Sequence, residues 1–168
     1  GGEKFPATGR KTLTESWNGT NWTEVSDLNT ARTQLSGAGT YTAALAIAGN
    51  DGAGPKSAAN EEWNGTNWTE VGDLSTARDA LSACGTSSSA LAFGGTTPPG
   101  VTASTEEWTG AGANIGAWAT GGNLNTARMA MGGAGIQTAA LVFGGGLPSP
   151  FKNETESYNG SSWTEVNN

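Results

Sequence analysis

The sequence contains no histidine and only one cysteine among its 168 residues. Ser-His-Asp and Cys-His nucleophile systems require an imidazole base, so both kinds of active site are excluded. Zinc centres built from cysteine and histidine are excluded for the same reason. The single cysteine, Cys84, cannot form an internal disulfide. It aligns with Ala38 and Ala134 in the repeats described below, which predicts a small core position rather than a reactive thiol.

Charged side chains and long apolar runs are scarce as well. Only 14% of the residues are charged, and fifteen acidic against eight basic side chains give a net charge of −7. Binding to a nucleic acid backbone requires clustered lysine and arginine, which this balance disfavours. No apolar run approaches the roughly 18 residues of a membrane-spanning helix. We therefore expect neither nucleic acid binding nor membrane insertion.

Glycine and tryptophan are abundant instead, and the sequence repeats itself. The phrase WNGTNWTEV at 17–25 returns unchanged at 63–71 and returns as YNGSSWTEV at 158–166. The phrase Thr-Ala-Arg recurs too, and its arginines stand at intervals of 46 and 50 residues at Arg32, Arg78 and Arg128. A catalytic loop is needed only once. A repeat of this length indicates a structural unit that cannot bury its apolar face alone.

Each copy has the pattern of four short β-strands. After each repeated arginine comes a strand in which large apolar residues occupy every second position, as expected for a strand with one large-residue face. These pairs are Leu45/Ile47, Leu91/Phe93 and Leu141/Phe143. The Asn-Gly pairs between the aromatic runs favour two-residue hairpin turns with positive φ at both central residues. Four strands in each repeat of 40–50 residues are typical of β-propeller blades.

The predicted architecture is therefore an all-β propeller arc of about three and a half blades. Residues 1–28 supply the outer two strands of a partial blade, and complete blades follow at 29–74, 75–124 and 125–168. Propellers close with 4–8 blades, so this number does not make an ordinary ring. We expect the chain to belong to a longer polypeptide or to an assembly in which neighbours cover the exposed sheet edges.

The order of these features resembles the Kelch motif over nearly the whole chain. Its double glycine is matched by Gly1-Gly2, Gly94-Gly95 and Gly144-Gly145, whereas the first full copy has Ala48-Gly49. Its first aromatic position is matched by Trp17, Trp63, Trp108 and Tyr158, and its second by Trp22, Trp68, Trp118 and Trp163. We expect these aromatic residues to be structural and to pack between neighbouring blades; direct stacking on a ligand is the alternative. The phrasing WNGTNWTEV…LNTAR is also similar to Kelch-like arrays in tail and other structural proteins of bacteriophages.

The basic residues all fall in one set of loops. In a four-stranded meander, the loops after Gly-Gly and the links between blades lie on the same face of the disc, and this face also carries most of the variation between copies. A constant frame with variable loops is typical of binding surfaces, although solvated loops are the alternative. The candidate binding residues are Lys4, Phe5, Arg10, Lys11, Arg32, Lys56, Arg78, Arg128, Phe151 and Lys152. For the three repeated arginines, a structural role is favoured, in which each ties its link to a glutamate of a neighbouring blade.

The sequence predicts no catalytic residues, no metal site and no cofactor. A copper oxidase among the Kelch-like propellers uses histidine ligands, which have no counterpart here. The adjacent carboxylates Glu61-Glu62 and Glu106-Glu107 point to opposite faces of a strand, which disfavours a glycosidase pair. The run Asn50-Asp51-Gly52 lacks the spaced acids of a calcium loop and is expected to be a turn.

These observations favour a non-enzymatic structural or binding module. The resemblance to bacteriophage arrays implies a virion-associated propeller, in a tail or fibre, that serves assembly or attachment to a host surface. Its expected partners are other protein subunits and a cell-surface glycan or protein, and its expected location is the virion or the extracellular space. The alternative is a glycan-binding or protein-scaffold propeller of a cellular or secreted protein. Exposed tryptophan pairs in pockets between blades would favour this alternative.

Overall fold

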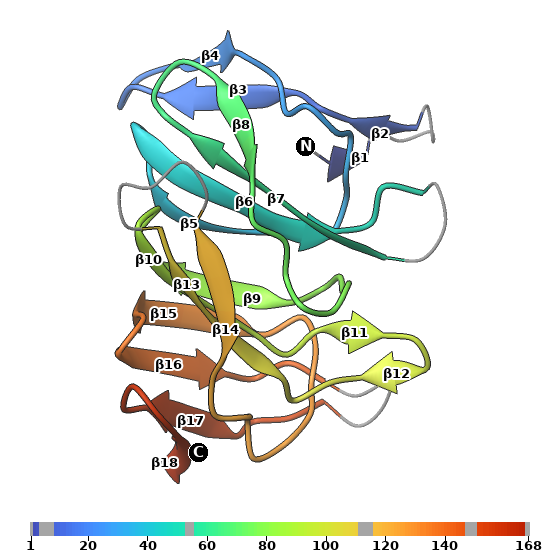
Figure 1. Cartoon of the computed structure of the whole chain (residues 1–168), viewed down its shortest axis with the longest axis vertical. Helices are drawn as coiled ribbons and strands as arrows, with labels where there is room; N and C mark the ends of the chain where they lie inside the picture. Colours follow the sequence, from blue (N-terminus) through green and yellow to red (C-terminus); the bar gives the residue numbers. More distant parts are fainter. Residues whose placement is uncertain (1, 4–8, 53–55, 111–115, 147–150, 167–168) are drawn as a thin grey trace.

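The computed structural model describes residues 2–3, 9–52, 56–110, 116–146 and 151–166. Over these ranges the protein is all-β and has no helix, as the strand periodicity predicts (Figure 1). The same ranges accordingly include no helix of the length and apolarity needed to cross a membrane.

Three four-stranded antiparallel sheets follow one another along the chain. The first sheet consists of β5 (Ser36–Thr40), β6 (Ala43–Gly49), β7 (Ser57–Trp63) and β8 (Trp68–Val71). The second sheet consists of β9 (Ser82–Gly85), β10 (Ser89–Phe93), β13 (Thr105–Thr109) and β14 (Ala117–Thr120). The third sheet consists of β15 (Gly132–Ile136), β16 (Ala139–Phe143), β17 (Thr155–Tyr158) and β18 (Trp163–Val166). In each sheet the strands lie side by side in chain order.

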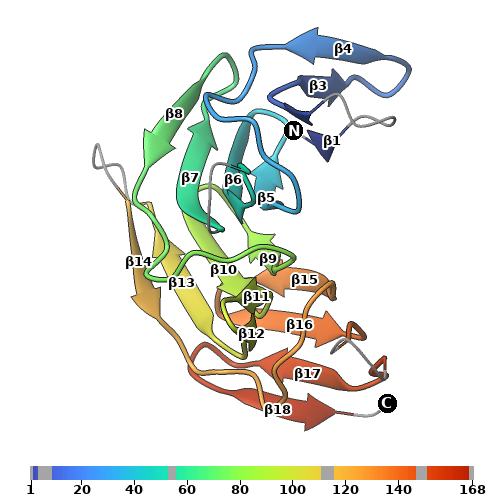
Figure 2. The same ribbon diagram turned by 90° about the vertical axis from the view of Figure 1, so that its right-hand side faces the viewer.

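A two-stranded sheet, here called the N-terminal sheet, precedes them and consists of β3 (Thr14–Trp17) and β4 (Trp22–Val25). Two small hairpins extend from the loops: β1 (Gly2–Glu3) pairs with β2 (Arg10–Lys11), and β11 (Thr96–Thr97) pairs with β12 (Gly100–Val101). The sheets are stacked in an arc, and the innermost strands β5, β9 and β15 contact one another in that order (Figure 2).

Backbone hydrogen bonds join neighbouring sheets at their links. The Ala80 N–H donates to the Gln34 carbonyl, and the Ala130 N–H donates to the Ala80 carbonyl, both over 2.9–3.0 Å. The Gly49 N–H likewise donates to the Arg78 carbonyl over 3.0 Å. The same contact thus recurs from sheet to sheet, which shows that the repeats are related by a regular step.

The apolar core lies between the sheets rather than within any one of them. Leu45 and Ile47 of β6 pack in one cluster with side chains of the second sheet. Leu91 and Phe93 of β10 pack in a second cluster with side chains of the third sheet, among them Val142. The large-residue faces of the first and second four-stranded sheets are therefore buried by the sheet that follows.

A buried ion pair joins the link to the third strand within each four-stranded sheet. The paired atoms are Arg32 Nη2 and Glu61 Oε1 at 2.6 Å, Arg78 Nη2 and Glu106 Oε1 at 3.0 Å, and Arg128 Nη2 and Glu156 Oε1 at 2.6 Å. All three guanidinium groups are fully buried. The prediction that each arginine reaches a neighbouring repeat's glutamate is wrong, because the partner lies in the arginine's own sheet. Full burial also makes these arginines structural rather than binding residues.

The Asn-Gly turns differ from the expected two-residue hairpins. Trp17 pairs directly with Trp22, so four residues connect β3 to β4. Gly19 has φ +95°, but Asn18 does not have a positive φ. Instead, the Asn18 side-chain oxygen accepts hydrogen bonds from the N–H groups of Thr20 and Asn21, both at 2.9 Å. The turns at Asn64 and Asn159 repeat this arrangement.

Replacing a buried arginine should strongly destabilise the protein. In Arg78→Met, the Glu106 carboxylate stays buried without its guanidinium partner, and such changes cost about 3–5 kcal/mol. Lys152→Met is the control, because its ion pair with Glu154 is partly exposed and contributes about 0–1 kcal/mol. The free energy of unfolding from urea denaturation measures both changes. Similar small losses in the two variants would show that the buried pair does not hold the link to the sheet.

The second glycine of the Gly-Gly pair should not tolerate a side chain. Gly95 has φ +98°, its N–H donates to the Arg128 carbonyl, and an added Cβ would lie 2.6 Å from the Asp79 carbonyl oxygen. We expect Gly95→Ala to cost roughly 2 kcal/mol or more in unfolding free energy. Gly100→Ala in the adjoining hairpin has no atom within 4 Å of the new Cβ and should change stability by less than about 0.5 kcal/mol. Equal effects of the two substitutions would contradict this account.

Candidate functional site: an aromatic cavity beside the N-terminal sheet

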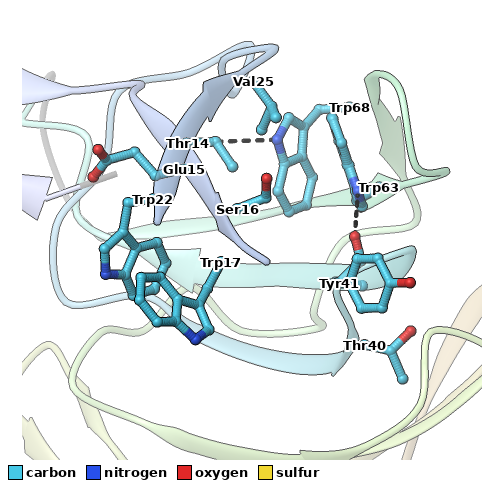
Figure 3. Close-up of a pocket in the computed structure, with 11 residues that line it drawn as sticks. Thr14, Glu15, Ser16, Trp17, Trp22, Val25, Thr40, Tyr41, Trp63 and Trp68 are labelled. Atoms are coloured by element: carbon cyan, nitrogen blue, oxygen red, sulfur yellow. Dashed lines mark hydrogen bonds between the residues drawn. The ribbon is translucent and has the colours of Figure 1, made fainter. Parts of the chain in front are cut away.

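A cavity of about 310 Å³ lies between the N-terminal sheet and the first four-stranded sheet (Figure 3). Its lining is mainly apolar and includes two tryptophan pairs, one from each sheet. The lining residues are Thr14, Glu15, Ser16, Trp17, Trp22, Val25, Thr40, Tyr41, Ala44, Trp63 and Trp68. The cavity is the strongest candidate for a binding site, because a concave and mainly apolar lining with a few polar groups is typical of such sites.

The aromatic pair has nearly the same geometry in every repeat. It faces across the outer hairpin because its two residues are paired in the strand register. The ring centroids are 5.4 Å apart for Trp17 and Trp22, 5.4 Å for Trp63 and Trp68, 5.3 Å for Trp108 and Trp118, and 4.9 Å for Tyr158 and Trp163. The pair is thus a structural feature of the hairpin that exists in sheets with and without an adjacent cavity.

The pair differs between sheets in its exposure. Trp17 and Trp22 are 46% and 65% exposed, whereas Trp63 is 6% and Trp108 0% exposed. The buried members lie against the two inner strands of their own sheet. No such strands accompany β3 and β4 in the part of the chain that the structure describes. The Trp17 surface at the cavity is therefore one that inner strands cover on Trp63 and Trp108, whereas counterparts of Trp22 pack against the preceding sheet.

Inner strands also supply a hydrogen-bond acceptor for the first aromatic residue. The indole N–H of Trp63 donates to the Tyr41 carbonyl over 3.1 Å, and that of Trp108 donates to the Ser87 carbonyl over 2.7 Å. Both carbonyls belong to the turn between the two inner strands of the same sheet. No described residue accepts a hydrogen bond from the Trp17 indole N–H.

The second aromatic residue contacts the preceding sheet through a threonine in the first and third sheets. The Trp68 indole N–H donates to Thr14 Oγ1 over 3.2 Å, and the Trp163 indole N–H donates to Thr105 Oγ1 over 3.0 Å. The Trp163 ring also meets the Phe93 ring edge-on at 5.1 Å. Trp68 and Trp163 thus pack between neighbouring sheets.

Trp118, the second aromatic residue of the second sheet, departs from this arrangement. Its ring is partly buried and packs against the apolar cluster that joins the first and second sheets, but no described residue accepts a hydrogen bond from its buried indole N–H. Asn60 occupies the strand position at which Thr14 and Thr105 supply the acceptor. The Asn60 amide is already engaged, because its oxygen accepts from the Ala48 N–H and its nitrogen donates to two backbone carbonyls. From the other repeats, the Trp118 indole N–H would be expected to donate a hydrogen bond to the preceding sheet. Trp118 instead contacts that sheet by apolar packing alone.

A second apolar surface lies at the opposite end of the stack. Leu141 and Phe143 on the third sheet are 44% and 47% exposed, although the equivalent Leu91 and Phe93 are fully buried. A shallow depression lined by Ala134, Gly135, Ala139, Ala140, Leu141, Ser157 and Tyr158 lies on the same sheet. Both ends of the stack therefore expose side chains whose counterparts are buried inside it.

The basic residues predicted to form a binding face are largely engaged in contacts between loops. Arg10 donates to the Asn50 backbone and side-chain oxygens over 2.9 and 3.0 Å. Lys56 contacts Asp79 and Thr96 of the next repeat. Burial raises the pKa of Asp79, but hydrogen bonds from Lys56 and Thr96 outweigh it and hold this pKa below its usual value. These two cations therefore connect neighbouring repeats.

The remaining predicted residues are placed differently from one another. Lys152 pairs with Glu154 at 3.0 Å, and Lys11 is half-buried in β2. Phe151 is 91% exposed. Lys4 and Phe5 lie outside the described residues. The binding face therefore stays a prediction, for which Phe151 offers the most accessible apolar side chain of those named.

Sequence reasoning missed one contact between sheets. Tyr158 replaces the tryptophan of the other copies, and its hydroxyl donates to Glu107 Oε1 over 2.5 Å. Burial, reinforced by the Glu107 carboxylate, raises the pKa of Tyr158 to about 12. The exchange of Trp for Tyr at a repeated position was the available signal in the sequence for this contact.

Cys84 is buried in the same region, and burial raises the pKa of its thiol to about 11.

Comparison of the sequence with models of protein families and with curated proteins finds no match. Within the described residues, no group of three or more Cys, Asp or Glu side chains is arranged to hold a metal ion. The adjacent glutamates are engaged in the contacts given above, since Glu61 and Glu106 pair with arginines and Glu107 accepts from Tyr158.

The two classes of tryptophan should differ sharply on truncation. Trp108→Ala removes a fully buried ring and should cost about 3–5 kcal/mol in unfolding free energy. Trp22→Ala removes a largely exposed ring that lies against Trp17, so the cost should be about 1 kcal/mol or less. Urea denaturation followed by circular dichroism measures both values. Comparable losses would mean that the N-terminal sheet is as enclosed in solution as the second sheet.

Proposed function

We propose that the protein is an arc of a Kelch-like β-propeller that acts as a non-enzymatic structural and binding module. In this proposal the three four-stranded sheets are complete blades and the N-terminal sheet is the outer half of another. The regular step between sheets, the antiparallel meander in each and the repeated Arg–Glu pair support it. A propeller is built by such radial repetition of four-stranded sheets.

One observation carries the assembly function: the stack ends on an apolar face that every preceding four-stranded sheet buries. Leu141 and Phe143 expose nearly half of their surface there, beside the depression near Tyr158. Contiguous exposed apolar surface is typical of sites where another protein docks. The proposed partner at this end is a neighbouring subunit of an assembly.

The location of that assembly rests on the sequence resemblance. The repeated phrasing is similar to Kelch-like arrays in bacteriophage tail and structural proteins, so we propose a virion-associated module, in a tail or fibre. The variable loops, with the exposed Phe151, would then meet a cell-surface glycan or protein. The net charge of −7 does not favour nucleic acid as the partner.

Native mass spectrometry combined with photo-cross-linking tests this proposal. A photo-reactive amino acid at position 143 should cross-link to a neighbouring subunit in the native assembly, whereas the same amino acid at position 119 serves as a control. Ala119 is a suitable control because it is exposed on the outermost strand of the second sheet, away from both ends of the stack. A free monomer of 16.9 kDa without a cross-link at position 143 would contradict the assembly function.

A second candidate function is carbohydrate binding, and the exposed Trp17/Trp22 pair in the cavity favours it. Aromatic faces beside hydroxyl and carboxylate groups provide both apolar contact and hydrogen bonds for a sugar. Glu15, Thr14 and Ser16 supply such polar groups. Binding of soluble oligosaccharides that quenches tryptophan fluorescence in the native protein but not in Trp22→Ala would support this function.

A further inference from the structure

Within the described residues, the strand β3 has a free edge where the equivalent strands have a partner. β7, β13 and β17 each pair with the outermost strand on one side and with an inner strand on the other. In the described part of the chain, β3 pairs with β4 alone. An unpaired strand edge presents backbone N–H and C=O groups that can receive another strand.

The carboxylate of Glu15 occupies the position of the three buried glutamates. Glu61, Glu106 and Glu156 each bind the arginine of a Thr-Ala-Arg segment that precedes the inner strands of the same sheet. Each also accepts a hydrogen bond from the backbone N–H of the residue just before that segment. Glu15 is exposed, and no described arginine pairs with it. The missing group at this position is therefore a guanidinium.

A second cavity, of about 320 Å³ and widely open to solvent, corresponds to a position that an aromatic ring fills elsewhere. It is lined by side chains that include Leu28, Leu35, Gly37 and Trp68. Their counterparts in the third sheet are Leu124, Met131, Gly133 and Trp163, and they surround Phe93 of the preceding sheet. This second cavity, beside Trp68, can thus receive a large apolar side chain from a strand beside β3.

We propose that the edge of β3 binds a β-hairpin of the repeat type, preceded by Thr-Ala-Arg and contributed by another polypeptide segment. The hairpin would complete the N-terminal sheet as a fourth unit of the stack. Its arginine would pair with Glu15, its Phe or Ile would enter the cavity beside Trp68, and its turn carbonyl would accept the Trp17 indole N–H. This inference deepens the proposed assembly function, on which it rests for the idea that the stack docks with other chains.

The register of the bound hairpin follows from the third sheet. There Ala140 pairs with Tyr158, and Phe143 pairs with Thr155. The sequence Thr-Glu-Ser of β3 is identical to that at 155–157 in β17. The partner's alanine would therefore lie opposite Trp17, and its phenylalanine opposite Thr14.

A synthetic peptide with the sequence of residues 125–146 is the probe, because it contains Thr-Ala-Arg and both inner strands of one repeat. We expect it to bind the whole chain with one-to-one stoichiometry in calorimetry. In nuclear magnetic resonance spectra, the indole N–H signals of Trp17 and Trp68 should shift, and the β3 amides should become protected from hydrogen exchange. Shifts confined to the third sheet, or no binding, would overturn the inference.

Peptide variants test the two specific contacts without altering the fold of the protein. Arg128→Gln in the peptide should weaken binding at least about tenfold, because Glu15 would lose its charged partner. Phe143→Ala in the peptide should weaken it by about a hundredfold, since the second cavity would stay empty. Equal affinity of all three peptides would overturn the inference.

A double-mutant cycle isolates the ion pair. In the Glu15→Gln protein, the native and Arg128→Gln peptides should bind with similar affinity. Glu70→Gln is the matched control, because it makes the same charge change on the outer strand of the first sheet, where Glu61 already holds Arg32. The tenfold difference between the peptides should persist in this control. Loss of the tenfold difference in the Glu70→Gln protein as well would show that net charge alone governs binding and would overturn the proposed pairing.

Three outcomes separate this inference from the functions proposed above. Saturable binding of maltohexaose at the Trp17 signal, without binding of the peptide, would overturn the hairpin site in favour of a carbohydrate site. Peptide binding by a chain that is a free monomer in its native source would leave the hairpin site standing and contradict the assembly function. If the peptide does not bind but the chain cross-links through position 143, the assembly function stands and the hairpin site is contradicted.

Discussion

The first and second four-stranded sheets bury their large apolar side chains against the sheet that follows, and the whole stack depends on that contact. Leu91 and Phe93 are fully buried because the third sheet covers them, whereas Leu141 and Phe143 point outward. Burial of a leucine or phenylalanine side chain contributes about 1.5–3 kcal/mol, so each contact between sheets outweighs any single hydrogen bond. A repeat is therefore stable only between neighbours, and the two ends of the stack are where interactions with other molecules are expected.

The buried Arg–Glu pair has a different role, since it orders each repeat internally. It joins the link that enters a sheet to the third strand of that sheet, so the link is held on one path. Burial lowers the pKa of Arg78, and the attraction of Glu106 counteracts this desolvation. A buried ion pair contributes little net stability but is costly to break, so it defines one arrangement of the chain. The apolar faces hold the sheets together, and the ion pairs fix where each link runs.

The sequence was sufficient to predict what depends on periodicity. Alternating residues such as Leu91/Phe93 predicted the strands, and the repeated aromatic pairs predicted the outer hairpins, since both patterns are local. It did not predict the partner of Arg78, because links and strands of the same and neighbouring repeats contain identical candidates. It also overestimated the number of free cations, because Lys56 contacts Asp79 in a loop whose path depends on tertiary contacts.

The tryptophans Trp17 and Trp118 illustrate the same limit. The sequence context of Trp17 is nearly identical to that of Trp63, yet one ring is exposed and the other is buried. The difference arises from strands that lie beside one and not the other in the described chain, which no local pattern encodes. The missing acceptor of Trp118 likewise depends on Asn60 in a different sheet. The cavity and the free strand edge could therefore be found only from the arrangement of the sheets.

Residue-resolved hydrogen exchange of the backbone amides tests the central claim that a sheet gains its stability from the neighbours that cover its faces and its inner edge. The account predicts the greatest protection in β10 and β13 of the second sheet, which lies between two others, and much weaker protection in β3 and β4. Uniform protection across the N-terminal sheet and the three four-stranded sheets would contradict the account. It would mean that each sheet is stable without its neighbours.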